Sequence, residues 1–271
     1  MLSDEQRIEL YGGLPREAIV RASGSGWRIE TPTIKVDGRQ EVGILIQGGI
    51  HSQSAQLSHK VREFARRGFT VGCIDQSGAA TVSKSTNFYD CADYARFVAR
   101  DLAALETLGL SRVIAYGSSL GAGASIALAA EAPECVTAVI AVSPASLIRQ
   151  NPWFVAAKFA LSSFQVPEKD FTPQSTRGPG VGEMLREGLG KAKNLAASDI
   201  GLNYLARVSC PVLIYTGKRD FVFPWRRLKG LEDQFPNLRV LVVDNFIHSD
   251  PNSRKKINWL VADAMRRLEI N

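Results

Sequence analysis

The sequence predicts an α/β protein with a mostly parallel central sheet and helices on both of its faces. Short apolar runs alternate with longer segments of helical periodicity along most of the chain. These runs are nearly continuous, as expected for strands that are covered on both faces. With 271 residues, of which 45% are hydrophobic and 22% charged, the chain is long enough to bury a large core.

The elements follow one another in a regular order. Residues 19–36 alternate polar and apolar side chains, which predicts one or two antiparallel edge strands. The strands predicted after them cover residues 42–47, 69–74, 112–116, 136–142, 212–216 and 239–243. The helices predicted between and after these strands cover residues 54–67, 90–108, 120–130, 225–234 and 253–268.

The alternation breaks between residues 145 and 209, where no strand is evident. Three helices are predicted there, near residues 152–163, 181–197 and 200–207, with polar loops between them. An insert of this length is too long for a simple loop. We therefore expect an α/β core of residues 1–144 and 210–271, with residues 145–209 forming a helical lid.

Composition and charge exclude several classes of function. The net charge is +6, but Lys and Arg are scattered rather than gathered in a stripe, so we expect no nucleic-acid partner. The four cysteines and three histidines lack the spacing of a metal site, and no metal is expected. No apolar run is long enough to span a membrane, and the N-terminus is polar and acidic, unlike a secretory signal. The expected location is the cytoplasm.

The pentapeptide Gly117-Ser118-Ser119-Leu120-Gly121 matches the pattern G-x-S-x-G and lies directly between a predicted strand and a predicted helix. This context is that of a nucleophile elbow, a sharp turn that lifts a serine hydroxyl above the sheet. The flanking glycines allow the backbone segments to approach closely. The alternative interpretation is that Ser119 is an ordinary helix N-cap, which would not need both glycines.

The motif and its setting resemble the α/β-hydrolase superfamily, from about residue 42 to the C-terminus apart from the lid. The resemblance implies a catalytic triad in the chain order Ser, acid, His. His248 is the only histidine after Ser119 and lies before the last helix, where the family places its base. Asp220 follows a strand and a Gly turn and is the expected acid, with Asp244 as the reserve candidate.

The resemblance also implies an oxyanion hole made of two backbone amides. One is expected from Leu120 and the other from Gly49, although Gln47 stands where many relatives carry His. Four side chains are candidates for substrate binding: His51, Ser118, Trp153 and Phe154. The alternatives are that His51 is an exposed loop residue and that the two aromatic residues only dock the lid.

Together these residues predict a serine hydrolase that cleaves a carboxylic ester or thioester of a small, partly apolar substrate. A C–C bond between carbonyl groups or an amide could be cleaved by the same triad, and no cofactor is needed. An acyltransferase or cyclase with this triad, and a non-catalytic ligand-binding sensor on the same fold, are the alternatives. Dehalogenases and epoxide hydrolases of the superfamily carry Asp at the elbow, so the serine disfavours them.

Overall fold

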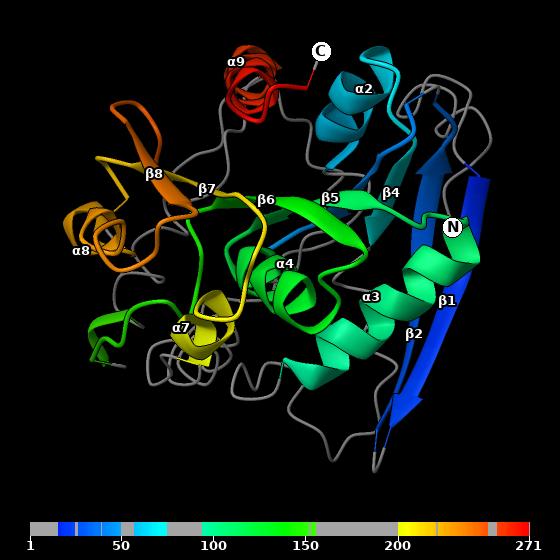
Figure 1. The fold of residues 1–271 in the computed structure, drawn as a ribbon, viewed down its shortest axis with the longest axis horizontal. Coiled ribbons are helices and arrows are strands. Elements are labelled where there is room, and N and C mark those ends of the chain that lie inside the picture. Colours follow the sequence, from blue (N-terminus) through cyan, green and yellow to red (C-terminus); the bar gives the residue numbers. More distant parts are fainter. Residues whose placement is uncertain are drawn as a thin grey trace, which may run out of the picture.

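The computed structural model describes residues 16–24, 27–38, 40–49, 57–74, 94–151, 153–155, 200–220, 222–248 and 254–270. Within these residues the strands form one eight-stranded sheet in the order β1-β2-β4-β3-β5-β6-β7-β8 (Figure 1). The strands are β1 (Arg16–Gly24), β2 (Trp27–Val36), β3 (Gly43–Gln47), β4 (Val71–Ile74), β5 (Val113–Ser118), β6 (Val136–Val142), β7 (Val212–Gly217) and β8 (Leu238–Val243). The helices are α2 (Ser58–Arg66), α3 (Ala95–Leu108), α4 (Leu120–Glu131), α7 (Ile200–Leu205), α8 (Trp225–Lys229) and α9 (Arg254–Arg267).

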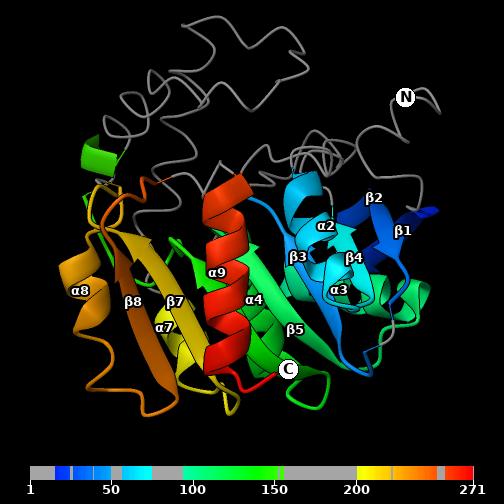
Figure 2. The same ribbon diagram turned by 90° about the horizontal axis from the view of Figure 1, so that it is seen from above.

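The sheet has one antiparallel part and one parallel part. Strands β1 and β2 form an antiparallel hairpin, and β2 pairs antiparallel with β4. Strands β4, β3, β5, β6, β7 and β8 run parallel to one another and lie side by side (Figure 2). The predictions of antiparallel edge strands and of a mostly parallel sheet are therefore confirmed.

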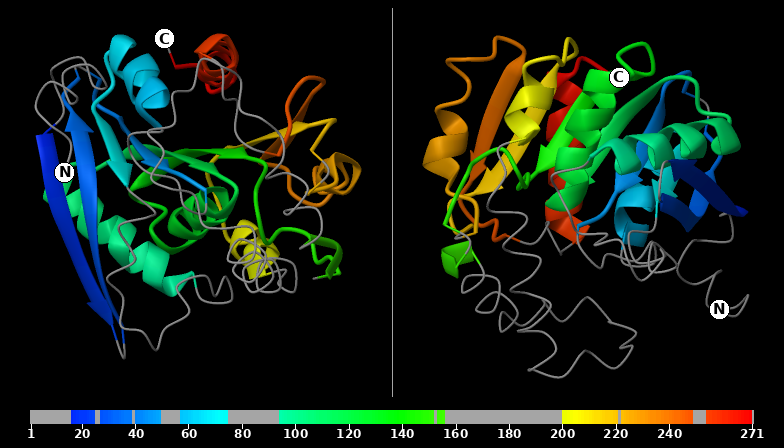
Figure 3. Two further views of the ribbon diagram at one scale, coloured as in Figure 1. Left: turned by 180° about the vertical axis from the view of Figure 1, so that it is seen from behind. Right: turned by 90° about the horizontal axis from the view of Figure 1, so that it is seen from below.

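Helices cover both faces of the sheet, as predicted. Helices α2 and α9 lie against one face, and α3 and α4 lie against the other (Figure 3). Neighbouring side chains in β3 show how the strands supply both cores: Ile44 and Ile46 join the cluster with α2 and α9, whereas Leu45 joins the cluster with α3 and α4. The continuous apolar runs of the sequence follow from this two-sided burial.

The helix predicted over residues 225–234 is shorter than expected. It ends at Lys229, and Gly230 caps it in the αR conformation. Glycine is a poor helix former, and the chain continues as turns, in which the Gln234 N–H donates to the Leu231 carbonyl at 3.0 Å. The apolar periodicity of residues 225–234 therefore continues past the end of the helix.

The lid is described only at its two ends. Helix α7 confirms the last of the three helices predicted between residues 145 and 209. Residues 156–199, which hold most of the other two, lie outside the described residues, so the lid stays a prediction. Over the ranges that the structure describes, no helix combines the length and apolar character needed to cross a bilayer.

Candidate active site

Ser119 occupies a strained turn between β5 and α4. Its backbone has φ of 53° and ψ of −115°, a region that residues other than glycine rarely adopt. The turn is held by its main chain: the Ser119 N–H donates to the Val142 carbonyl at 2.9 Å, and its own carbonyl accepts from the Ala145 N–H at 3.0 Å. The Ser119 hydroxyl makes no capping hydrogen bond to α4, so the interpretation as an ordinary N-cap is wrong.

The first turn of α4 touches the end of β3 through Gly121. A Cβ atom at Gly121 would lie 2.6 Å from the Gln47 carbonyl oxygen and would also overlap the Gly48 carbonyl. Only glycine allows this approach. Gly49 follows at once, and Leu120 is the first residue of α4, whose N–H has no partner within the helix. The two amides predicted for an oxyanion hole therefore come from segments in direct contact.

His248 and Asp220 form a buried pair. The His248 Nδ1 atom lies 3.3 Å from Asp220 Oδ1 and 3.4 Å from Oδ2. Both residues are buried, with 7% and 3% of their surfaces exposed. The imidazole also packs edge-on against the Phe223 ring, with the ring centroids 5.1 Å apart. This arrangement fixes the plane of the imidazole and directs Nδ1 toward the carboxylate.

The surroundings of Asp220 favour its ionised form. Burial alone would raise the pKa of this carboxyl group, but His248 together with the hydrogen bonds from Phe223 and Ser143 holds the pKa below its usual range. The N–H groups of Val222 and Phe223 donate to Oδ1 at 2.9 and 3.0 Å, and the Ser143 hydroxyl adds a further hydrogen bond. An ionised carboxylate is what is needed to orient an imidazole and stabilise its charged form.

A second close approach brings the His248 loop to the strand that carries Asp220. A Cβ atom at Gly217, the last residue of β7, would overlap the carbonyl group of Phe246. Phe246 is itself buried, two residues before His248. The glycine that the sequence places before Asp220 therefore allows the loop after β8 to settle against β7.

The topology collects the predicted residues at one edge of the sheet. Ser119 follows β5, Asp220 follows β7 and His248 follows β8, while Gly49 follows β3. Because these strands are parallel, their carboxyl ends lie at the same edge, where ligands of open α/β sheets usually bind. The structure pairs His248 with Asp220 and not with the reserve candidate Asp244, which is exposed and forms an ion pair with Lys218 at 2.7 Å.

The candidates for substrate binding differ in their exposure, and one of them lies outside the described residues. Ser118 is buried as the last residue of β5. Trp153 and Phe154 are exposed over 74% and 59% of their surfaces, and their role stays a prediction. His51 lies outside the described residues. In the part of the chain that the structure describes, no cluster of three or more His, Cys, Asp or Glu side chains could hold a metal ion.

Two features of this region were not predicted from the sequence. The first is Ser143, which follows β6 with φ of 46° and supports Asp220; no sequence pattern marks such a backbone. The second is a buried polar cluster around Arg100 and Asp101. These two charges interrupt the apolar face of α3 between Phe97 and Ala104, which is a signal that helical periodicity could have provided.

A parallel sheet with a serine on a strained strand–helix turn and a buried His–Asp pair at the same edge defines the α/β-hydrolase class. A family model described as "alpha/beta hydrolase fold" matches residues 44–181 of the chain. The chain belongs to this family. A comparison with curated protein sequences finds no match.

Solved structures of several hydrolases share the fold at low sequence identity. A thermophilic esterase from Thermogutta terrifontis is 14% identical, with a TM-score of 0.68 over 93% of this chain and 99% of that one. The carboxylesterase CesB from Bacillus subtilis is 18% identical, with a TM-score of 0.63 over 98% and 94%. Epoxide hydrolase A from Mycobacterium thermoresistibile is 18% identical, with a TM-score of 0.64 over 95% and 100%. At these identities the likeness establishes the fold.

Proposed function

We propose that the chain is a serine hydrolase that cleaves a carboxylic ester or thioester of a small, partly apolar substrate through an acyl-enzyme. The observation that supports this most directly is the strained Ser119 at the sheet edge that also carries the buried His248–Asp220 pair. Strained backbone conformations cluster at active sites, so a strained serine at this edge of the sheet supports a catalytic role. A serine at this position also favours ester chemistry over the epoxide opening named for one similar structure.

In the proposed reaction His248 is the general base. Its Nδ1 faces Asp220, which leaves Nε2 as the nitrogen that accepts the Ser119 proton. The serine oxygen attacks the substrate carbonyl, and the amides of Leu120 and Gly49 donate to the developing oxyanion. The imidazolium then protonates the leaving alcohol or thiol. A water molecule, deprotonated by His248, hydrolyses the acyl-enzyme and restores the serine.

The test is labelling with a fluorophosphonate, which reacts with an activated serine. We expect the wild type to be labelled at Ser119 and the Ser119→Ala variant to remain unlabelled. Ser111→Ala is a matched control, because Ser111 is exposed and lies before β5, far along the strand from the turn. Folded wild-type protein that is not labelled would contradict the proposal and favour a non-catalytic ligand-binding sensor.

Substrate class is tested by a screen of p-nitrophenyl esters and acyl thioesters of graded chain length. We expect turnover that falls by a factor on the order of 10⁴ or more in Ser119→Ala. Product analysis with and without an added alcohol or amine separates hydrolysis from acyl transfer. A product that contains the added nucleophile in place of the free acid would show an acyltransferase.

A further inference from the structure

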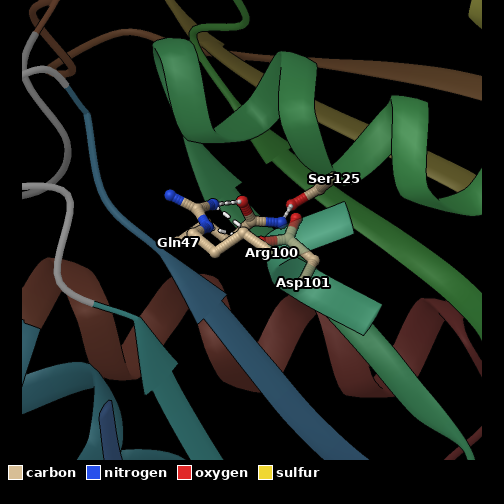
Figure 4. A network of polar contacts seen from close by, with 4 residues as sticks. All are labelled: Gln47, Arg100, Asp101 and Ser125. Atoms are coloured by element: carbon tan, nitrogen blue, oxygen red, sulfur yellow. Dashed lines mark hydrogen bonds and ion pairs between the residues drawn. The ribbon is translucent and has the colours of Figure 1, made fainter. Parts of the chain in front are cut away.

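A buried polar cluster links three elements on the α3–α4 side of the sheet (Figure 4). The Arg100 guanidinium on α3 donates through Nη2 to Gln47 Oε1 at 2.9 Å and to Asp101 Oδ1 at 2.7 Å. The Gln47 Nε2 group donates to the Ser125 hydroxyl on α4 at 3.2 Å. Gln47, Arg100, Asp101 and Ser125 each have 0% of their surface exposed.

Four fully buried polar side chains, two of them ionisable, are unusual inside an apolar core. Burial of a charged pair is costly, and it is tolerated only where the geometry is good and the remaining polar atoms have partners. Arg100 meets this condition through a second contact to Asp101, from Nε at 2.9 Å, and through the Phe97 ring, whose centroid lies 5.0 Å from the Arg100 Cζ atom. Asp101 meets it only in part, because its buried Oδ2 atom has no hydrogen-bond partner among the described residues. The proposed reaction uses none of these four groups directly.

The amide of Gln47 is the link between the cluster and the candidate active site. Gln47 is the last residue of β3, and its main chain contacts Gly121 in the first turn of α4. Its side chain is bound to α4 by Ser125, one turn further along the helix, and to α3 by Arg100. Both the main chain and the side chain of Gln47 are therefore held in place, and Gly49 lies only two residues further along the chain.

We propose that Gln47, held by Arg100 and Ser125, is a positioning residue that sets the Gly49 amide opposite the Leu120 amide. This inference rests on the proposed function, because it assigns the cluster a role in the oxyanion hole of that site. The side chain acts through the backbone and does not touch the substrate. Loss of its contacts would let the segment after β3 shift relative to α4, and a misplacement of about 1 Å in a catalytic site costs on the order of 100-fold in rate.

The test is the Gln47→Met variant, which keeps an unbranched side chain of similar length but removes both hydrogen bonds. With a p-nitrophenyl ester that the wild type turns over, we expect kcat to fall about 10- to 100-fold while KM changes by less than about threefold. The inhibition constant of a trifluoromethyl ketone, which forms an oxyanion with Ser119, should rise by a similar factor. Weaker hydrogen bonding to the oxyanion predicts both changes.

Tyr215→Phe is the matched control. The Tyr215 hydroxyl donates a buried hydrogen bond to Asp263 at 2.9 Å on the opposite face of the sheet, so its loss disturbs the core without reaching β3. We expect kcat of this variant within about twofold of the wild type. If Gln47→Met does not fold, Ser125→Ala replaces it and should show the same loss of kcat at unchanged KM, by about 3- to 10-fold.

The outcomes separate the two proposals. A wild type without Ser119-dependent labelling or turnover overturns the proposed function and this inference with it. An active wild type whose Gln47→Met and Ser125→Ala variants keep full kcat and inhibitor affinity overturns the inference alone. A fall in kcat of the same size in Tyr215→Phe would also overturn it, because the effect would then follow from general loss of core packing.

Discussion

The strain at Ser119 can be measured without any substrate by comparing Ser119→Gly with Ser119→Ala. Both variants lack the hydroxyl, but only glycine adopts φ of 53° and ψ of −115° without steric cost. Strain of this kind is worth about 1–3 kcal/mol, and the larger entropy of glycine in the unfolded chain subtracts about 0.4–1 kcal/mol. We therefore expect Ser119→Gly to be more stable than Ser119→Ala by about 0.5–2 kcal/mol.

The assay is urea unfolding followed by circular dichroism, supported by Tm values. In a domain of this size the expected difference corresponds to roughly 1–4 °C in Tm. The control is the same pair of substitutions at Ser118, which lies in β5 without a positive φ. There the alanine variant should be the more stable of the two, because glycine weakens a regular strand. An alanine variant at Ser119 as stable as the glycine variant would show that the turn is not strained and would refute the reasoning.

Further predictions concern the groups around the turn. Asp220→Asn should lower kcat by about 10³–10⁴-fold, because the carboxylate no longer holds the imidazole, whereas Asp244→Asn should leave kcat unchanged; equal losses would contradict the assignment. Gly217→Ala should lower the free energy of unfolding, measured in urea, by on the order of 1–3 kcal/mol and should lower kcat, because the added Cβ overlaps the Phe246 carbonyl near the imidazole. Gly230→Ala is the control and should be close to neutral, because the atom nearest to its added Cβ lies 3.6 Å away. Burial raises the pKa of Asp101 from 3.8 to about 6, so between these values the folded protein keeps a proton that the unfolded chain has released. The free energy of unfolding of the wild type, measured relative to that of Asp101→Asn, should therefore fall by up to about 3 kcal/mol as pH rises through this range. Free energies of unfolding that change with pH in the same way in both proteins would contradict the raised pKa.

The fold follows from local patterns and was largely predictable. Buried strands such as β6 are marked by continuous apolar runs, and the boundary predicted for residues 136–142 is the observed one. Helix ends were less predictable where the periodicity continued past a glycine, as at Gly230. The pairing of β2 with β4 could not be predicted, because strand order depends on contacts between distant segments rather than on local sequence.

The candidate site was predictable where a motif or an elimination applied. The elbow motif made Ser119 the candidate nucleophile. The resemblance to the family, which places its base after the nucleophile, left His248 as the only candidate, and the structure pairs His248 with Asp220 as expected. Ser143 was missed because its role depends on a backbone conformation that sequence does not encode locally. The Gln47–Arg100 contact was missed for a related reason, since it joins residues that are 53 positions apart and that only the packing of α3 against the sheet and α4 brings together.

At Gly121 the helix and the end of β3 meet through main-chain atoms, so in our proposal the distance between the Leu120 and Gly49 amides depends on this contact and on the bound side chain of Gln47. A mutagenesis library aimed at the proposed activity should therefore randomise side chains outside the buried cluster of Gln47, Arg100, Asp101 and Ser125. Positions 47, 48, 49, 100, 121 and 125 should be kept constant in such a library. The exposed Trp153 and Phe154 are the natural first positions to vary.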